Sequence, residues 1–211
     1  MTRSARRALP REFYARPTLE VTHDLIGKVL VHDSPAGSSA GIIVEAEAYI
    51  GEDDPACHAA PGPTKRNEPL YGPPGVAYVY LNYGMHYLVN VVTEATGAPA
   101  AVLIRALAPV DGIPLMLERR RLRQGHGGQG AGKAIQEADL CRGPGNLTKA
   151  LGITLEENRL DLTNSRLWIE DRGFEPGRLS WGPRIGINVG TESPWRCWAS
   201  GHVCVSGKRI K

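Results

Sequence analysis

The stretch GIIVEAEAYIG, residues 41–51, carries the residue types best suited to chemistry. Read with the two-residue period of a β-strand, it places Ile43, Glu45, Glu47 and Tyr49 on one face and only apolar residues on the other. Two carboxylates on a buried strand need partners, and such surroundings perturb the proton affinity of a carboxyl group. Glu47 is the leading candidate for a general base, although the spacing does not separate it from Glu45. The alternative is that both glutamates are ion-paired strand residues.

His58 follows this strand within a segment rich in acids and prolines. It could donate a proton or read a ligand through a hydrogen bond, or it could be an ordinary polar surface residue. With Glu45, Glu47, Asp53 and Asp54 near it a metal site is also conceivable, but the spacing fits no known metal motif.

Tyr78, Tyr80, Tyr83 and Met85 form an aromatic cluster suited to stacking a flat ring such as a nucleobase. Core packing is the alternative for Tyr78 and Tyr80. Tyr83 falls at the expected tip of a hairpin, where a large exposed ring indicates contact with a partner. A side chain at such a tip has a suitable shape for insertion between the base pairs of a duplex.

Candidate phosphate contacts are Arg66, Asn67, Arg105 and the arginine run at residues 119–123. Arg105 is a lone arginine within the apolar run at 100–110, and a charge in such surroundings requires a carboxylate or an anion as its partner. An acidic centre with basic flanks suits acid or base chemistry on a polyanion, although arginine runs are also common on solvated helix faces.

Hydrophobic periodicity and turn residues indicate the elements that position these side chains. Residues 25–33 and 41–50 read as the two strands of a hairpin, and residues 76–92 read as a second hairpin around Asn82, Tyr83 and Gly84. The remaining expected strands cover 100–110, 166–171, 184–189, 195–200 and 202–207, and the expected helices cover 112–123 and 141–153. Strands that adjoin in hairpins predict an α+β domain with a largely antiparallel or mixed β-sheet, a protruding β-hairpin and surrounding helices.

A chain of 211 residues with a net charge of +3 fits one domain. We expect a flexible basic N-terminal arm at 1–16, in which residues 10–14 could begin a short helix, and a single domain at 17–211. The glycine-rich segment 125–132 is expected to be a flexible loop. No stretch is apolar enough for a membrane span, and four dispersed cysteines indicate a reducing cytoplasm.

Six motifs in this order resemble the alkyladenine (3-methyladenine) DNA glycosylase family, as a bacterial member: VEAEAYIG, EDDPACHA, GPTKRN, YVYLNYGMHYLVN, VLIRALAP and CRGPGNLTKALGI. The resemblance spans roughly residues 17–206, with a weaker match through RIGIN. It implies that Glu47 activates the water that attacks the deoxyribose C1′, and that Arg105 and the backbone carbonyl of Ile185 hold this water. It further implies that Tyr49 and Tyr80 sandwich the flipped base.

The same resemblance implies that His58 hydrogen-bonds the edge of the base and that Asn90 screens purines by their 2-amino group. Tyr83 would fill the gap left in the duplex, and Met85 would lie beside it against neighbouring base pairs. The implied activity is base-excision repair of alkylated or deaminated purines in double-stranded DNA, without a cofactor or metal. The glycine-rich segment and the N-terminal arm have no counterpart in this resemblance.

We therefore expect a monofunctional N-glycosyl hydrolase that acts as a monomer on the bacterial nucleoid in the cytoplasm. One alternative is a non-catalytic protein that binds damaged DNA and keeps the tyrosine wedge. A carboxylate at position 47 argues against it, because an unneeded negative charge facing a polyanion would only weaken binding. The other alternative is a metal-dependent hydrolase that uses Glu45, Glu47, Asp53 and His58.

Overall fold

The computed structural model describes residues 8–121 and 134–207. The helices are α1 (Arg11–Tyr14), α2 (Thr18–Leu25), α3 (Ile113–Arg121) and α4 (Pro144–Leu151), with short 3₁₀ turns η1 (Glu68–Tyr71), η2 (Glu137–Asp139) and η3 (Leu155–Glu157). The strands are β1 (Val29–Ser34), β2 (Gly37–Ile50), β3 (Ala77–Asn82), β4 (His86–Val92), β5 (Ala100–Asp111), β6 (Leu167–Glu170), β7 (Leu179–Gly182) and β8 (Arg196–Ala199). The expected glycine-rich loop at 125–132 lies outside the described residues.

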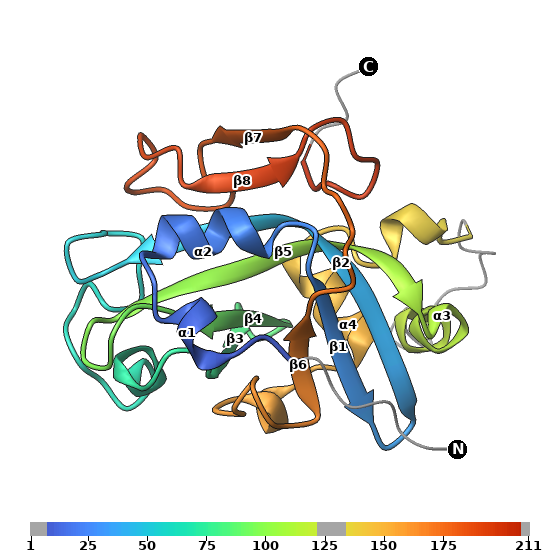
Figure 1. Ribbon diagram of the computed structural model, residues 1–211, viewed down its shortest axis with the longest axis horizontal. Coiled ribbons are helices and arrows are strands. Elements are labelled where there is room, and N and C mark those ends of the chain that lie inside the picture. The colour runs from blue at the N-terminus through green and yellow to red at the C-terminus, as the bar shows by residue number, and fades with distance from the viewer. Residues whose placement is uncertain (1–7, 122–133, 208–211) are drawn as a thin grey trace.

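The strands form one antiparallel sheet in the order β3-β4-β5-β2-β1-β6, and β8 pairs with both β2 and β7. Figure 1 shows β7 and β8 together along one side of the molecule, with α1 and α2 lying in front of the central strands. The predicted α+β class, its antiparallel sheet and both predicted hairpins are therefore confirmed. The connection between β1 and β2 is tighter than expected, because Ser34 already pairs with Gly37.

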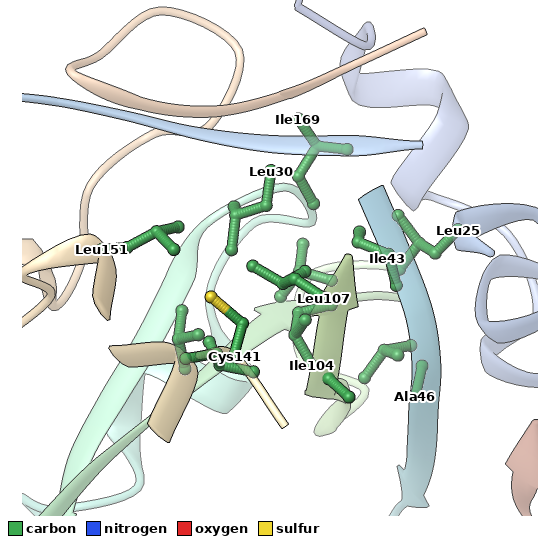
Figure 2. Packing of buried hydrophobic residues seen from close by; sticks show 14 of the residues in the cluster. Leu25, Leu30, Ile43, Ala46, Ile104, Leu107, Cys141, Leu151 and Ile169 are labelled. Atoms are coloured by element: carbon green, nitrogen blue, oxygen red, sulfur yellow. The ribbon is translucent and has the colours of Figure 1, made fainter. Parts of the chain in front are cut away.

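The main hydrophobic core joins the sheet to the helices. Leu25 of α2 and Leu151 of α4 both belong to it, together with Ile104 and Leu107 of the central strand β5. Figure 2 shows these side chains converging with Ile43 and Ala46 of β2. α4 ends as predicted at Gly152, which has a φ of 73° and so takes the left-handed conformation that terminates many helices.

Two register shifts lie side by side where β2 pairs with β5. Ile43 pairs with Leu107 and Glu45 with Ala106, so Val44 is an extra residue in β2. Ala46 then pairs with Ile104, so Arg105 is an extra residue in β5. Such bulges turn side chains from one face of a strand to the other.

The bulges correct the predicted face of Ile43. Strict alternation placed Ile43 with Glu45, Glu47 and Tyr49, but Ile43 packs in the main core with Val44 and Ala46. Beyond the bulge the alternation resumes with the opposite parity. The first part of β2 therefore turns its odd-numbered residues to the core, and the last part turns Glu47 and Tyr49 away from it.

Two predicted strands were wrong. Residues 184–189 and 202–207 form turns and irregular backbone, because side chains bind their backbone groups in place of a neighbouring strand. The carbonyls of Val205 and Gly207 accept hydrogen bonds from Arg142, and the N–H of Ser206 binds Glu45. Strand β7 and helix α2 were not anticipated, and residues 25–28 precede the first strand instead of opening it.

The described part of the expected N-terminal arm differs from the prediction. Residues 8–16 pack on the domain: Ala8 pairs with Glu170, and the Tyr14 side chain is fully buried at the end of α1. Arg11 donates to the carbonyl of Pro74. The short helix expected near residues 10–14 is present as α1. In the segments 8–121 and 134–207 no helix is long and apolar enough to cross a bilayer.

Candidate active site

A cavity of about 370 Å³ opens between the β3–β4 hairpin, the ends of β2 and β5, and the backbone near residue 185. This volume lies within the usual range for small-molecule sites. Several predicted site residues line it: Tyr49, His58, Tyr80, Tyr83, Asn90, Arg105 and Ile185. Further lining residues, which the sequence analysis did not place in a site, include Asn82, Leu103, Pro144, Gly186 and Ile187. The fold thus brings together residues from six separate stretches of the chain.

The Glu47 carboxylate lies directly behind the wall of this cavity and has no solvent exposure. Its Oε1 accepts a hydrogen bond from the backbone N–H of Ile185 at 2.7 Å. Its Oε2 accepts from the Tyr49 hydroxyl at 2.9 Å and from Arg105 at 3.1 Å. Burial raises the pKa of Glu47, although Arg105, the Ile185 N–H and the Tyr49 hydroxyl act in the opposite direction. All three donors line the cavity, so each of them connects the buried Glu47 carboxylate to the cavity wall through one hydrogen bond.

Glu45 is equally buried and shares Arg105 with Glu47, but its other donors are different. Its carboxylate accepts hydrogen bonds from Arg196 at 3.0 Å, from the Ser206 N–H at 2.7 Å and from the Ser206 hydroxyl at 2.9 Å. Neither Arg196 nor Ser206 lines the cavity. The structure therefore separates the two glutamates that spacing could not: Glu47 is connected to the cavity, and Glu45 belongs to the supporting framework.

Arg105 bridges the two carboxylates. Its Nε lies 3.2 Å from Glu45, and one terminal nitrogen lies 3.1 Å from Glu47 and 3.3 Å from the carbonyl oxygen of Ile185. Burial acts to lower the pKa of Arg105, but Glu47 and Glu45 raise it overall, so this guanidinium stays charged. These buried partners balance the charge of Arg105 without a phosphate. The alternative expectation, a carboxylate partner for the lone arginine, is confirmed.

Tyr80, Tyr78 and His58 form one aromatic wall. The His58 and Tyr80 rings lie 4.4 Å apart between centroids, and Tyr78 lies 5.3 Å from Tyr80. His58 Nδ1 lies 2.9 Å from the Tyr78 hydroxyl. Burial, followed by the nearby Arg66 charge, lowers the pKa of His58, which favours its neutral form. Burial also raises the pKa of Tyr78 to about 12, so its hydroxyl keeps a proton that it can donate.

Asn90 lies on β4 directly opposite Tyr78 of β3 and is buried. Its side-chain amide donates to the backbone carbonyl of Tyr78 at 3.0 Å. This bond fixes the amide at the cavity wall. The neighbouring Cys57 also lines the cavity, and burial raises the pKa of its thiol to about 11, so it is protonated at neutral pH and poorly suited to act as a nucleophile.

Asn67 is not available as a phosphate contact, which corrects that prediction. Its side chain is buried, donates to the carbonyls of His58 at 2.7 Å and Gly62 at 2.9 Å, and accepts from the Thr64 N–H. Asn67 therefore fastens the long loop that carries His58. Arg66 is exposed beside it, with its guanidinium 5.6 Å from the centre of the Tyr80 ring, and stays a candidate contact for a polyanion.

The arginine run at the end of α3 is partly structural. Arg119 donates to the hydroxyls of Ser34 and Ser39 and to the carbonyl of Ala150. Arg120 donates to the carbonyl of Leu140 at 2.5 Å. These two arginines therefore fasten α3 to the domain and are not free phosphate contacts. Residues 122 and 123 lie outside the described part of the chain.

The tip of the β3–β4 hairpin projects beside the cavity. Tyr83 is 81 % exposed and Met85 is 62 % exposed. Tyr83 has a φ of 48°, which is rare for a bulky residue and marks a strained turn. Gly84 follows with a φ of 67°, as expected for this turn. The predicted placement of Tyr83 at an exposed tip is confirmed.

The sequence analysis missed a buried ion pair next to the site. Arg184 and Asp54 lie 130 positions apart and face each other through two short hydrogen bonds. An arginine inside the apolar run RIGIN was the one available signal, but it was read as part of a strand. For a metal, the described ranges 8–121 and 134–207 hold no group of three or more His, Cys, Asp or Glu side chains arranged as ligands.

Comparison with known families matches residues 12–203 to a family described as methylpurine-DNA glycosylase. Three similar proteins carry the name "Putative 3-methyladenine DNA glycosylase". The one from Rubrobacter xylanophilus is 48 % identical over 189 residues, 89 % of this chain and 92 % of its own. The one from Methanocella arvoryzae is 46 % identical over 202 residues, 94 % of this chain and 95 % of its own. The one from Myxococcus xanthus is 46 % identical over 194 residues, 90 % of this chain and 89 % of its own.

Proposed function

Since this chain belongs to the methylpurine-DNA glycosylase family, we propose that it removes damaged purines from duplex DNA by hydrolysing the N-glycosidic bond with a water activated by Glu47. The observation that carries this proposal is the position of the Glu47 carboxylate. It is buried behind the cavity wall, and its three hydrogen-bond donors, Tyr49, Arg105 and Ile185, all line the cavity.

Hydrolysis of an N-glycosidic bond develops positive charge on the sugar. A carboxylate close to C1′ stabilises that charge and takes a proton from the attacking water. The Arg105 guanidinium and the Ile185 carbonyl oxygen lie 3.3 Å apart beside Glu47, so a donor and an acceptor are available to orient this water. Arg105 favours the ionised form of Glu47, because its charge opposes the effect of burial on the Glu47 pKa.

The base would enter the aromatic cavity. Tyr49 and Tyr80 offer ring faces for stacking, and a purine made cationic by alkylation gains from contact with electron-rich rings. When the Tyr78 hydroxyl donates to His58 Nδ1, neutral His58 carries its proton on Nε2 and can donate it to the edge of the base. Asn90, held at the wall by Tyr78, is placed to screen the purine edge.

The exposed hairpin tip suits the flipping step. Tyr83 would occupy the space that the flipped nucleotide leaves, and Met85 would pack against the neighbouring base pairs. Alkylated and deaminated purines pair weakly, which lowers the cost of extrusion. We propose that the protein performs this step as a monomer.

The test is single-turnover release of the base from duplexes with one hypoxanthine or one ethenoadenine, and from methylated DNA, with EDTA present. We expect release by the wild type without strand cleavage, and no release by Glu47→Gln. Glu157→Gln is the matched control, because Glu157 is a buried carboxylate that does not line the cavity.

Release that persists in Glu47→Gln would contradict the role of Glu47. Release that disappears only when EDTA is added would point to a metal-dependent hydrolase. If no substrate is cleaved although the duplexes bind normally, the protein is a binder of damaged DNA and not an enzyme.

A further inference from the structure

Arg184 and Asp54 form a fully buried pair that does not line the cavity. The two terminal nitrogens of Arg184 lie 2.6 and 2.8 Å from the two carboxylate oxygens of Asp54, in a fork that only arginine can make. Burying two charges is costly, and an apolar pair in the same space would often be as stable or more stable. The pair therefore calls for an explanation other than stability.

The same two side chains bind the backbone of three segments. Arg184 donates to the carbonyl of Ala48 at 3.1 Å, near the end of β2, and to the carbonyl of Gly190 at 3.2 Å. Asp54 accepts from the N–H groups of Ile50 and Ala56. The pair thus fixes β2, the start of the loop that leads to His58, and the irregular segment 183–195 relative to one another.

Arg184 also lies against the Tyr49 ring. Its guanidinium carbon is 4.7 Å from the centre of the Tyr49 ring and 5.0 Å from the Trp195 ring. The Tyr49 hydroxyl donates to Glu47 at the other end of the ring. The orientation of Tyr49 is therefore set by Arg184 at its face and by Glu47 at its hydroxyl.

The residue after Arg184 provides both backbone contacts to the site. The Ile185 N–H donates to Glu47, and the Ile185 carbonyl accepts from Arg105. No β-sheet ladder holds this stretch, because residues 184–189 are irregular. The bonds of Arg184 to Asp54 and to Gly190 restrain the start and the end of this stretch, together with the bond from Arg196 to the Pro183 carbonyl.

We propose that Arg184 and Asp54 are positioning residues for base excision, which hold the Tyr49 ring and the Ile185 peptide in the geometry that Glu47 requires. This inference rests on the proposed function. It predicts that loss of the pair lowers the rate of excision and not the affinity for the duplex, since neither side chain reaches the cavity.

The acidity of Glu47 provides a readout that a merely structural pair would not move. The groups that face this carboxylate are Tyr49 on β2, Tyr80 on β3, Arg105 on β5, and the Ile185 N–H and the Arg184 charge on the segment 183–195. The Ile185 N–H lowers the Glu47 pKa, so losing its alignment raises that pKa. Glu47 acts as a base only when it is ionised, and the acidic limb of the rate profile should therefore move to higher pH.

The decisive variant is the double substitution Arg184→Met with Asp54→Leu, which removes both buried charges and so avoids an orphaned one. We expect a single-turnover rate lowered about tenfold or more, since small displacements in an active site have large effects on rate. The affinity for lesion-containing duplex should stay within about twofold of the wild type. The double variant Arg166→Met with Glu157→Leu is the control, because it removes an ion pair that does not line the cavity, and it should leave the rate unchanged.

Arg184→Lys separates charge from geometry, and we expect it not to restore the rate, because an ammonium cannot make the fork. A folded Met and Leu double variant with the wild-type rate and pH profile would overturn the proposal, as would full activity of Arg184→Lys. The Glu47 pKa is also measured without catalysis, by ¹³C NMR of labelled glutamate in the wild type, the double variant and Arg184→Lys. The double variant loses the Arg184 charge that faces Glu47, whereas Arg184→Lys keeps a positive charge and so reports alignment. A raised Glu47 pKa in Arg184→Lys supports the positioning role even if the wild type cleaves no lesion, and an unchanged pKa contradicts it.

Discussion

Ser206 binds Glu45 through both its backbone N–H and its hydroxyl, at 2.7 and 2.9 Å. The same hydroxyl lies 3.3 Å from a terminal nitrogen of Arg105, and the Arg105 Nε lies 3.2 Å from Glu45. The Arg105 guanidinium is thus held on one side by Glu45 and Ser206 and on the other by Glu47. A segment far along the chain completes the support of the arginine that faces the cavity.

We predict that Glu45→Gln destabilises the protein by about 3 kcal/mol, because Arg105 and Arg196 lose a buried negative partner. The excision rate should also fall, because Arg105 loses the carboxylate that orients its Nε on the side away from Glu47. Urea unfolding and single-turnover kinetics measure the two effects. Ser206→Ala keeps the backbone bond and should have the smaller effect on both. If Glu45→Gln were as stable and as fast as the wild type, the supporting role of Glu45 would be wrong.

The raised pKa of Glu47 predicts a particular dependence of stability on pH. Burial raises this pKa above the ordinary value of 4.5, so the folded protein binds the proton more tightly than the unfolded chain does. This contribution to stability is complete below pH 4.5 and is lost as the pH rises through the raised pKa. Wild type should therefore lose stability relative to Glu47→Gln as the pH rises from acid to neutral.

Urea unfolding of both proteins at a series of pH values measures this difference. The opposite trend, with the wild type gaining on Glu47→Gln as the pH rises, would mean that the hydrogen bonds to Glu47 outweigh its burial. The excision rate should fall at low pH in parallel, because the protonated carboxyl group cannot accept a proton from water.

Arg66 and Asn67 are neighbours with different expected roles, and the salt dependence of binding separates them. Arg66→Ala should reduce the slope of log affinity against log salt by about 1, as expected for one lost phosphate contact. Asn67→Ala should leave this slope unchanged and destabilise the protein by about 1–3 kcal/mol, because the carbonyls of His58 and Gly62 lose their buried donor. An Asn67→Ala protein with normal stability and a reduced slope would restore the original interpretation of Asn67 as a DNA contact.

Tyr83→Ala should weaken binding to lesion-containing duplex by about 1–3 kcal/mol, the usual contribution of one aromatic ring that stacks on a base. Its stability should change by less than about 0.5 kcal/mol, because the ring is exposed. Leu81→Ala is the matched control on the same hairpin, since Leu81 is exposed but does not line the cavity. Equal binding losses in both variants would argue against a specific wedge.

The elements that alternate regularly were accessible from the sequence. The β3–β4 hairpin, the exposed Tyr83 at its tip and the neighbouring positions of Glu45 and Glu47 on β2 follow from the two-residue period and the turn at Gly84. The pattern could not reveal the bulges at Val44 and Arg105, because periodicity assumes an unbroken register. This is why Ile43 was assigned to the wrong face.

The irregular segments were less accessible for a related reason. Residues 184–189 and 202–207 have the composition of strands, but distant side chains bind their backbone groups. Arg184 joins Asp54, and Arg142 joins the carbonyls of Val205 and Gly207. Such contacts between positions far apart in the chain leave no local trace in composition or spacing. Asn67 was misread in the same way, since its position in a polar loop gave no sign that its amide is buried.

The two bulges between β2 and β5 also constrain how the chain length of these strands can change. Val44 adds one residue to β2, and Arg105 adds one to β5. The pair Ile43 and Leu107 and the pair Ala46 and Ile104 therefore lie in the same antiparallel register. The register shift that one extra residue causes is cancelled by the extra residue in the other strand. Deletion of Val44 alone would keep Glu47 on the face opposite Ile43, but it would leave the extra residue Arg105 without a matching insertion and shift the register beyond it, whereas deletion of both residues would keep the register and remove the arginine. A change in the length of one strand within this pairing therefore requires a matching change in the other.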